Sequence, residues 1–154
     1  GGRGSLSVMM LRSFSPTLWA SALWWGSLTA VGFGVVPMLF ANLPTPALAG
    51  AMAAKLFSAL TWVTVVCGLI LLLSFKRNEF LAQTNKGQAA LIFIVGGMLL
   101  ALLSEFAVAP RIVARDNLRL WHGLGTLMYV VQWVCAGITL AKMNAAQTAD
   151  QTAN

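Results

Sequence analysis

One side chain with a formal charge at pH 7 lies inside a long apolar stretch of this sequence. Glu105 belongs to the run 89–109 and stands five residues before Pro110. A carboxylate in the middle of a membrane span costs about 2.5 to 3.5 kcal/mol, so it needs a partner or a function. Three interpretations are open for Glu105: one half of a structural ion pair, a site for a proton or a substrate, and a side chain exposed at the membrane interface.

Several basic side chains occur near the same expected side of the membrane as Glu105. Lys55, Arg111 and Arg119 flank the polar segments between apolar runs, and His122 follows Arg119 by three residues. Opposite charges offset the cost of burying a carboxylate, so we predict a polar cluster of these four residues with Glu105. The basic residues alone are also suited to lipid phosphates or to an anionic substrate.

His122 is the one histidine in the sequence. An imidazole can form structural hydrogen bonds, relay a proton or bind substrate, or ligate a metal or haem. Haem and copper sites usually need a second ligand, for which Met38, Met52 and Met128 are the nearest candidates in the expected topology. We predict no metal and no cofactor, and keep haem or copper on His122 and Met38 as the alternative.

The composition excludes a water-soluble globule. Of the 154 residues, 58% are hydrophobic and only 9% are charged, whereas soluble domains devote about 25% to charged residues. The net charge is +6, but no basic run long enough for a nucleic-acid patch occurs. The sequence also contains no Walker loop, nucleophile elbow, HExxH or Rossmann glycine pattern. We therefore predict a protein that is not an enzyme and binds no nucleic acid.

Four apolar runs are each long enough to cross a membrane as a helix. They cover residues 17–41, 56–75, 89–109 and 120–141. In lipid the backbone must satisfy its own polar groups, and short connections make consecutive helices antiparallel neighbours. We predict an all-α fold, an integral membrane four-helix bundle of two similar transmembrane hairpins (up-down-up-down), over residues 17–142.

The two ends of the sequence differ from this apolar part. Residues 1–16 are set apart as partly artefactual or disordered, and the polar tail 143–154 is predicted to be disordered. Basic residues outside the spans favour both termini in the cytoplasm, because the side of the termini carries more of them. That side has Arg3, Arg12, Lys76, Arg77, Lys86 and Lys142, against Lys55, Arg111, Arg115 and Arg119.

The two halves of the sequence share a pattern. Residues 33–41 and 106–114 both read F-x-V-x-P-x-apolar-x-A, and residues 55–60 resemble 119–124. We predict an internal repeat of one hairpin with a pseudo-twofold axis along the membrane normal. Pro37 and Pro110 are expected to end the outgoing helices, because proline cannot donate to the helical ladder. Ser58 matches His122, so a symmetric cofactor site is not expected.

Small residues recur at four-residue spacing in the first run. They are Ala22, Gly26, Ala30 and Gly34. Such a stripe lies along one helix face, where the backbone of another helix can approach closely, although an Ala- and Gly-rich helix can also produce it by chance. We predict helix packing on this small-residue stripe, with the lipid bilayer and either a second copy or another membrane protein as partners.

Several short motifs resemble a known family. Trp25-Gly26, Phe33, Pro37-Met38-Leu39-Phe40, Leu43-Pro44, Ala49-Gly50, Lys55-Leu56-Phe57 and Leu120-Trp121-His122-Gly123 are similar to the bacterial domain of unknown function 4149 proteins, related to transmembrane protein 205. The resemblance implies a multi-pass protein of the bacterial inner membrane with four helices and no assigned reaction. It marks Gly26, Phe33, Pro37, Phe40, Arg119, His122 and Gly123 for testing. Trp121 departs from the pattern, where a smaller apolar residue is expected.

The sequence therefore predicts a small membrane protein of uncharacterised activity. The first hypothesis is a non-enzymatic module for a small solute, a proton or a lipid-associated task. The alternatives are a haem- or copper-binding redox module and a structural accessory subunit of a membrane complex.

Overall fold

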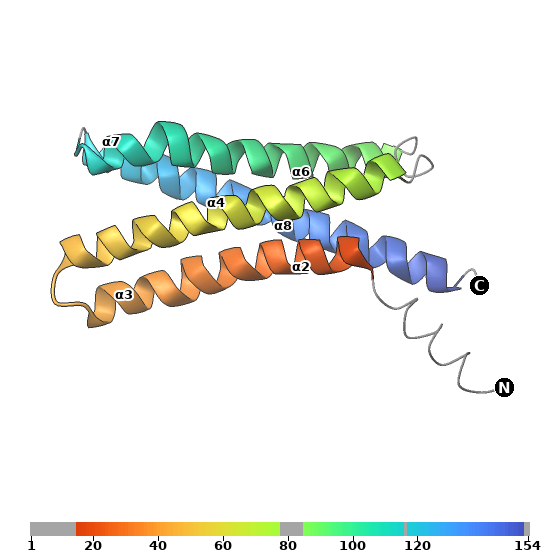
Figure 1. Ribbon diagram of the computed structural model, residues 1–154, viewed down its shortest axis with the longest axis horizontal. Coiled ribbons are helices and arrows are strands. Elements are labelled where there is room, and N and C mark those ends of the chain that lie inside the picture. Colours follow the sequence, from red (N-terminus) through yellow and green to blue (C-terminus); the bar gives the residue numbers. More distant parts are fainter. Residues whose placement is uncertain (1–14, 78–84, 116, 153–154) are drawn as a thin grey trace.

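The computed structural model describes residues 15–77, 85–115 and 117–152. Within these residues the chain forms four long helical rods (Figure 1). They are α2 (Pro16–Thr29) with η1 (Ala30–Val35) and α3 (Val36–Asn42), then α4 (Pro46–Arg77), then α6 (Asn85–Leu103) with η2 (Ser104–Val108) and α7 (Ala109–Val113), and finally α8 (Leu118–Thr152). All four rods are long and apolar enough to cross a membrane, so the predicted all-α four-helix membrane bundle is confirmed.

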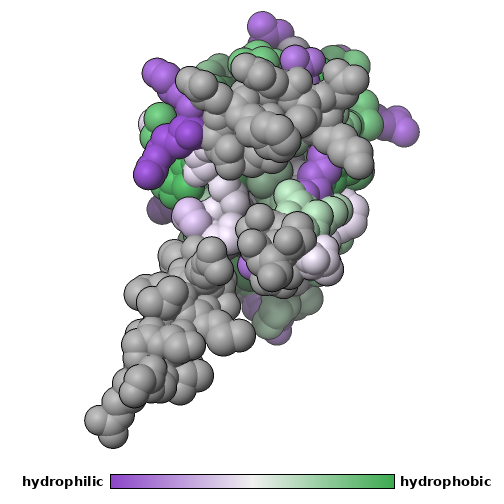
Figure 2. Space-filling model, turned by 90° about the vertical axis from the view of Figure 1, so that its right-hand side faces the viewer, coloured by the Kyte–Doolittle hydropathy of each residue, from purple (hydrophilic) through white to green (hydrophobic). Residues whose placement is uncertain are grey.

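The rods pack as a ring of antiparallel neighbours. Helices α2 and α6 each pack against both α4 and α8. The ends of α3 and α7 lie at one end of the bundle, which we call the proline end because Pro37 and Pro110 lie near it (Figure 1). The start of α2 and the ends of α4 and α8 lie at the opposite end, which we call the terminal end. Hydrophilic side chains lie around its rim in Figure 2.

The helices extend beyond the predicted spans where local capping or composition allows it. Helix α2 starts at Pro16, and Ser15 caps it by accepting the backbone N–H of Leu18 at 3.4 Å. Residues 1–14 of the predicted N-terminal segment lie outside the described residues. Helix α8 runs on through 143–152, which the sequence analysis assigned to a disordered tail. Alanine is a strong helix former, and the Thr148 hydroxyl donates back to the carbonyl of Asn144 at 3.0 Å.

The hydrophobic core is concentrated in the terminal half of the bundle. Trp24, Leu71 and Ile94 are fully buried there. A Cβ atom built on Gly97 would lie 2.6 Å from the Trp24 ring, so the indole packs across the bundle only over a glycine. In the proline half, by contrast, residues 30–48 and 117–131 contain no buried side chain. The proline half therefore leaves more side-chain surface uncovered.

Two π-helical turns interrupt the outgoing helices at matching positions. η1 ends two residues before Pro37, and η2 ends two residues before Pro110. The sequence analysis expected the outgoing helices to end at these prolines. In the structure they continue beyond them, to Asn42 in α3 and to Val113 in α7. The helices can continue because the wider π-helical turn shifts the backbone hydrogen bonds by one residue. Each proline then lies in the first turn of a new α-helical segment, where its missing N–H costs little.

Candidate functional site

The first π-helical turn leaves a backbone carbonyl without its helical donor. In an α-helix the N–H of Val36 would bond to the carbonyl of Gly32. In η1 it bonds to the carbonyl of Val31 instead. The next residue, Pro37, has no N–H to offer. The carbonyl oxygen of Gly32 is therefore unpaired within the helical ladder.

The second turn does the same to the carbonyl of Glu105. The N–H of Ala109 bonds to the carbonyl of Ser104, where an α-helix would direct it to Glu105. Pro110 follows and again supplies no N–H. Glu105 thus carries two kinds of acceptor at one place: its own backbone oxygen, freed by the turn, and its side-chain carboxylate.

The Glu105 carboxylate is held by a hydroxyl group on another helix. Ser58 of α4 donates a hydrogen bond from Oγ to Oε1 of Glu105 over 2.7 Å. Both side chains are half-buried between the helices. The second carboxylate oxygen, Oε2, accepts no hydrogen bond from any residue that the structure describes. The site thus brings together a carboxylate and a hydroxyl oxygen, and the same residue, Glu105, carries the carbonyl that η2 leaves unpaired in the helical ladder. Oxygen atoms of these kinds are the ligands that hard cations prefer.

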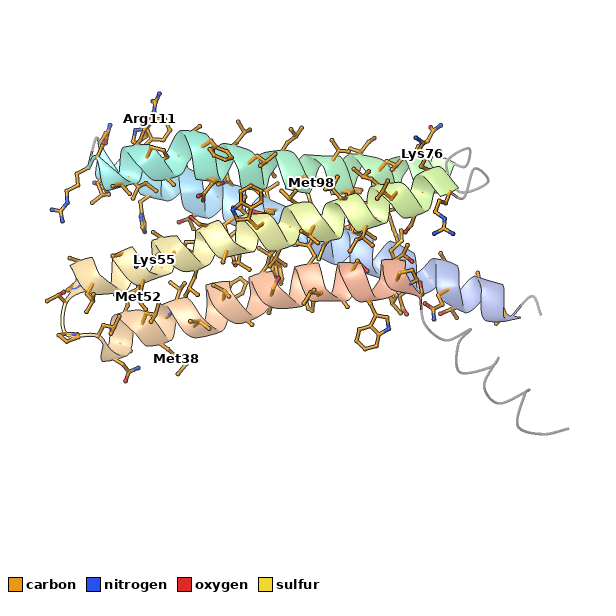
Figure 3. The ribbon with its side chains drawn as sticks, in the orientation of Figure 1. Met38, Met52, Lys55, Lys76, Met98 and Arg111 are labelled. Carbon is orange, nitrogen blue, oxygen red and sulfur yellow. The ribbon has the colours of Figure 1, made fainter. Side chains whose placement is uncertain are left out.

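The basic members of the predicted cluster take other positions at the proline end. The Arg111 guanidinium lies 4.4 Å from the centre of the Trp121 ring, a cation–π contact at the start of α8. Figure 3 places Lys55 and Arg111 at the proline end and Lys76 at the terminal end. Arg119 and His122 are exposed on the first turns of α8. Across residues 15–77, 85–115 and 117–152, none of these side chains forms an ion pair with Glu105.

The candidate metal ligands are exposed. The exposed fraction of Met38 is 64%, and His122 is exposed on α8. In the described part of the chain, no three His, Cys, Asp or Glu side chains gather where they could hold one metal ion.

The two glycines of the small-residue stripe have open space beside them in the part of the chain that the structure describes. A Cβ atom built on Gly26 or on Gly34 would meet no atom within 4 Å. Ala30 is exposed, and Ala22 is half-buried. The close approach of a backbone that this spacing permits is therefore not used between the described helices of one chain.

Comparison with known protein families gives a match for this chain. Residues 19–120 match the family described as Domain of unknown function (DUF4149), which is more than half of the chain. The chain belongs to the DUF4149 family. The comparisons with curated proteins and with solved structures gave no match.

The matched DUF4149 region contains the candidate site. Ser58, Glu105 and both prolines lie inside it, whereas His122 lies beyond its last residue. The relation to transmembrane protein 205 stays a prediction.

The sequence analysis missed polar residues that meet inside the DUF4149 bundle. Gln132 is 4% exposed, and its Nε2 donates to the Thr64 hydroxyl oxygen over 3.1 Å near the middle of α4 and α8. Ser58, Thr61 and Thr64 share one face of α4, because they recur every three residues. This spacing, and one amide inside an otherwise apolar run, were the signals available in the sequence.

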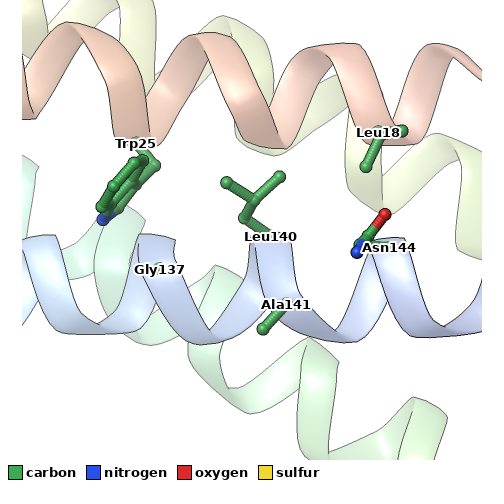
Figure 4. Close-up of a pocket in the computed structure, with 6 residues that line it drawn as sticks. All are labelled: Leu18, Trp25, Gly137, Leu140, Ala141 and Asn144. Atoms are coloured by element: carbon green, nitrogen blue, oxygen red, sulfur yellow. The ribbon is translucent and has the colours of Figure 1, made fainter.

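An open pocket of about 380 Å³ lies elsewhere, between α2 and α8 in the terminal half. Its lining is mostly apolar, with Asn144 as a polar side chain (Figure 4). The lining residues are Leu18, Trp25, Gly137, Leu140, Ala141 and Asn144. The pocket shares no residue with the Glu105 site, which lies toward the proline end.

Proposed function

We propose that this DUF4149 protein is a non-enzymatic membrane module that binds and passes a proton or a small cation at Glu105. The observation that carries the proposal is the hydrogen bond from Ser58 to Glu105, which places a carboxylate between two membrane-spanning helices. A carboxylate at this depth is costly without a function, and no basic partner among the described residues neutralises it. Reversible binding of a positive charge would offset that cost.

A line of polar groups leads from Glu105 toward the middle of the bundle. Ser58, Thr61 and Thr64 follow one another along α4, and Thr64 meets Gln132 of α8. Thr61 and Thr64 are both buried: the Thr61 hydroxyl donates to the carbonyl of Phe57 in its own helix at 3.1 Å, and the Thr64 hydroxyl accepts from Gln132 of α8. Beyond them toward the terminal end lie Leu71 and Trp24, which are fully buried and apolar in most of their surface. The line supports entry of a charge from the proline end.

The proposal includes a bacterial inner membrane location with both termini in the cytoplasm. Lys76 and Arg77 end α4 at the terminal end, which the positive-inside rule places in the cytoplasm. The proline end, with Glu105 nearer to it, then faces the outside. The internal repeat is part of the same proposal: η1 and η2 precede prolines at equal distances, as two copies of one hairpin would require.

The test is charge movement in proteoliposomes that contain the purified protein. A jump in pH or in salt concentration should produce a transient current on a solid-supported membrane. Glu105→Gln keeps the shape of the side chain and its hydrogen bond from Ser58, but removes the charge, and should reduce the current at least tenfold. Ser74→Ala is the control, because Ser74 bonds only to the carbonyl of Ile70 in its own helix at 2.8 Å. An unchanged current in Glu105→Gln would refute the proposal.

A homo-oligomer is the second part of the proposal, with the small-residue stripe of α2 and η1 as the contact. The free space at Gly26 and Gly34 supports it, because a second helix could approach closely there. Gly26→Leu should convert an oligomer to monomers in native mass spectrometry. Gly96→Leu is the control, since Gly96 has the same free space on α6. If both variants keep the oligomer, the stripe is not the interface.

A further inference from the structure

We infer that the Glu105 site binds a partly dehydrated alkali-metal cation, with the carboxylate of Glu105, the hydroxyl oxygen of Ser58 and the backbone carbonyl of Glu105 as its ligands. The inference deepens the proposed function, on which it rests for the choice of Glu105 as the site. It names the ligand class, and it adds the backbone oxygen to the ligand set.

The backbone oxygen is available because of two local facts that act together. The π-helical turn directs the N–H of Ala109 to Ser104, and Pro110 has none to replace it. A carbonyl freed inside a membrane span needs a partner, which a neighbouring side chain, an ordered water or a bound cation can provide. A cation bound at Glu105 would supply it, as unwound helices do at cation sites of membrane transporters.

The side-chain oxygens suit the same ligand. Ser58 uses its hydroxyl hydrogen on Oε1 of Glu105, which leaves the lone pairs of its oxygen free. Oε2 of Glu105 has no donor among the described residues, so it is free to bind a cation. The three groups are hard oxygen ligands, which favour alkali and alkaline-earth ions over the softer transition metals.

The charge at the site selects a monovalent ion. Glu105 is the one acidic side chain in the described part of α6, η2 and α7, and no second carboxylate contacts it among the described residues. One carboxylate neutralises one positive charge. A divalent ion would keep a net charge in a medium of low dielectric constant, which is costly.

The equivalent turn in η1 is the internal control. Gly32 also has an unpaired carbonyl before a proline, but it has no side chain, and Tyr129 lies against it. Pro110→Ala restores an N–H next to the Glu105 carbonyl and allows the helix to close. Pro37→Ala makes the same change in η1, where no carboxylate is present. The two variants therefore separate a cation ligand from a general effect of proline on the fold.

The experiment measures thermal unfolding of the detergent-purified protein in NaCl, KCl or LiCl, with choline chloride at the same ionic strength as reference. A cation that binds the folded state raises Tm by an amount that saturates with its concentration. We expect a saturable rise of a few degrees for at least one alkali cation over choline, lost in Glu105→Gln. Pro110→Ala should weaken the apparent affinity at least tenfold, and Pro37→Ala should leave it within twofold. Binding of radioactive ²²Na⁺, competed by each cation, gives a readout independent of unfolding.

The outcomes separate this inference from the proposed function. Equal Tm in all four salts with no ²²Na⁺ binding overturns the cation site. If Glu105-dependent current persists in choline chloride, the moving charge is then a proton and the proposed function stands. Saturable cation binding without any current supports the site and refutes the proposed passage of charge. Wild-type affinity in Pro110→Ala overturns the assignment of the backbone ligand.

Discussion

The two π-helical turns, η1 and η2, have the same backbone defect and different surroundings. Each shifts one N–H by one residue, precedes a proline and leaves one carbonyl unpaired. In η1 the residue at that carbonyl is Gly32, and the Tyr129 ring of α8 packs directly on it. In η2 the residue is Glu105, and the Ser58 hydroxyl of α4 donates a hydrogen bond to its carboxylate.

The same backbone geometry is covered by packed side chains in η1 and lies at the candidate binding site in η2. Three contacts tie α8 to the η1 region: the Tyr129 hydroxyl donates to the carbonyl of Leu28 at 2.6 Å, Trp133 Nε1 donates to Thr29 at 2.8 Å, and the Trp133 ring meets Phe33. An aromatic residue therefore closes η1. η2 instead keeps a carboxylate oxygen without a donor among the described residues, which leaves it able to bind a ligand.

The largest expected effect comes from breaking the closure of η1. In Gly32→Ala the new Cβ would lie 2.5 Å from Cε1 of Tyr129, a ring that Phe57 contacts edge-on from α4. Because the packed Tyr129 ring has little room to move away from the new methyl group, we expect a loss of about 3 kcal/mol in the free energy of unfolding. Reversible unfolding in mixed detergent and SDS micelles measures it.

Gly34→Ala is the matched control, two residues further along the same helix. Nothing lies within 4 Å of a Cβ atom at Gly34. Replacing an exposed helical glycine by alanine should be neutral or stabilising by up to about 1 kcal/mol. If both alanine variants lose the same stability, the contact with Tyr129 does not decide the choice of glycine at position 32.

A smaller effect is expected when the contact of η2 is removed. Ser58→Ala deletes the donor to the Glu105 carboxylate, and hydrogen bonds to charged groups are worth about 1.5 to 3 kcal/mol. We expect a loss of about 2 kcal/mol in the same unfolding assay. The double variant with Glu105→Ala should lose little more than the single variants, because either change alone already removes the hydrogen bond. Additive losses would mean that the hydrogen bond contributes nothing to stability.

The architecture was predictable because apolar runs of this length leave no other fold. In lipid each run must be a helix, and short connections force antiparallel neighbours, so the four rods follow from hydropathy alone. The helix ends at Pro37 and Pro110 were predicted wrongly. The loss of one N–H is visible in the sequence. The π-helical turn that accommodates each proline is visible only in the backbone hydrogen bonds of the structure.

The sequence identified the central residue of the candidate site, Glu105, but not the residue that contacts it. Glu105 was found because a carboxylate in an apolar run is rare. Its partner is Ser58, whereas the sequence pointed to basic residues, because charge complementarity is visible in a sequence and helix rotation is not. The same limit hid the pair of Thr64 and Gln132: two polar side chains on different helices meet only once the rotation of each helix is fixed.

The smallest expected effect separates the hydroxyl group of Tyr129 from its ring. Tyr129→Phe keeps the ring against Gly32 but removes the donor to the Leu28 carbonyl, so only a hydrogen bond is lost. Such bonds between membrane helices contribute about 0.6 to 1 kcal/mol. Hydrogen exchange should accelerate at the amides of η1 and stay unchanged at those of η2. Equal acceleration in both turns would mean that they open as one unit, and the contrast between a closed turn and a ligand-binding turn would fail.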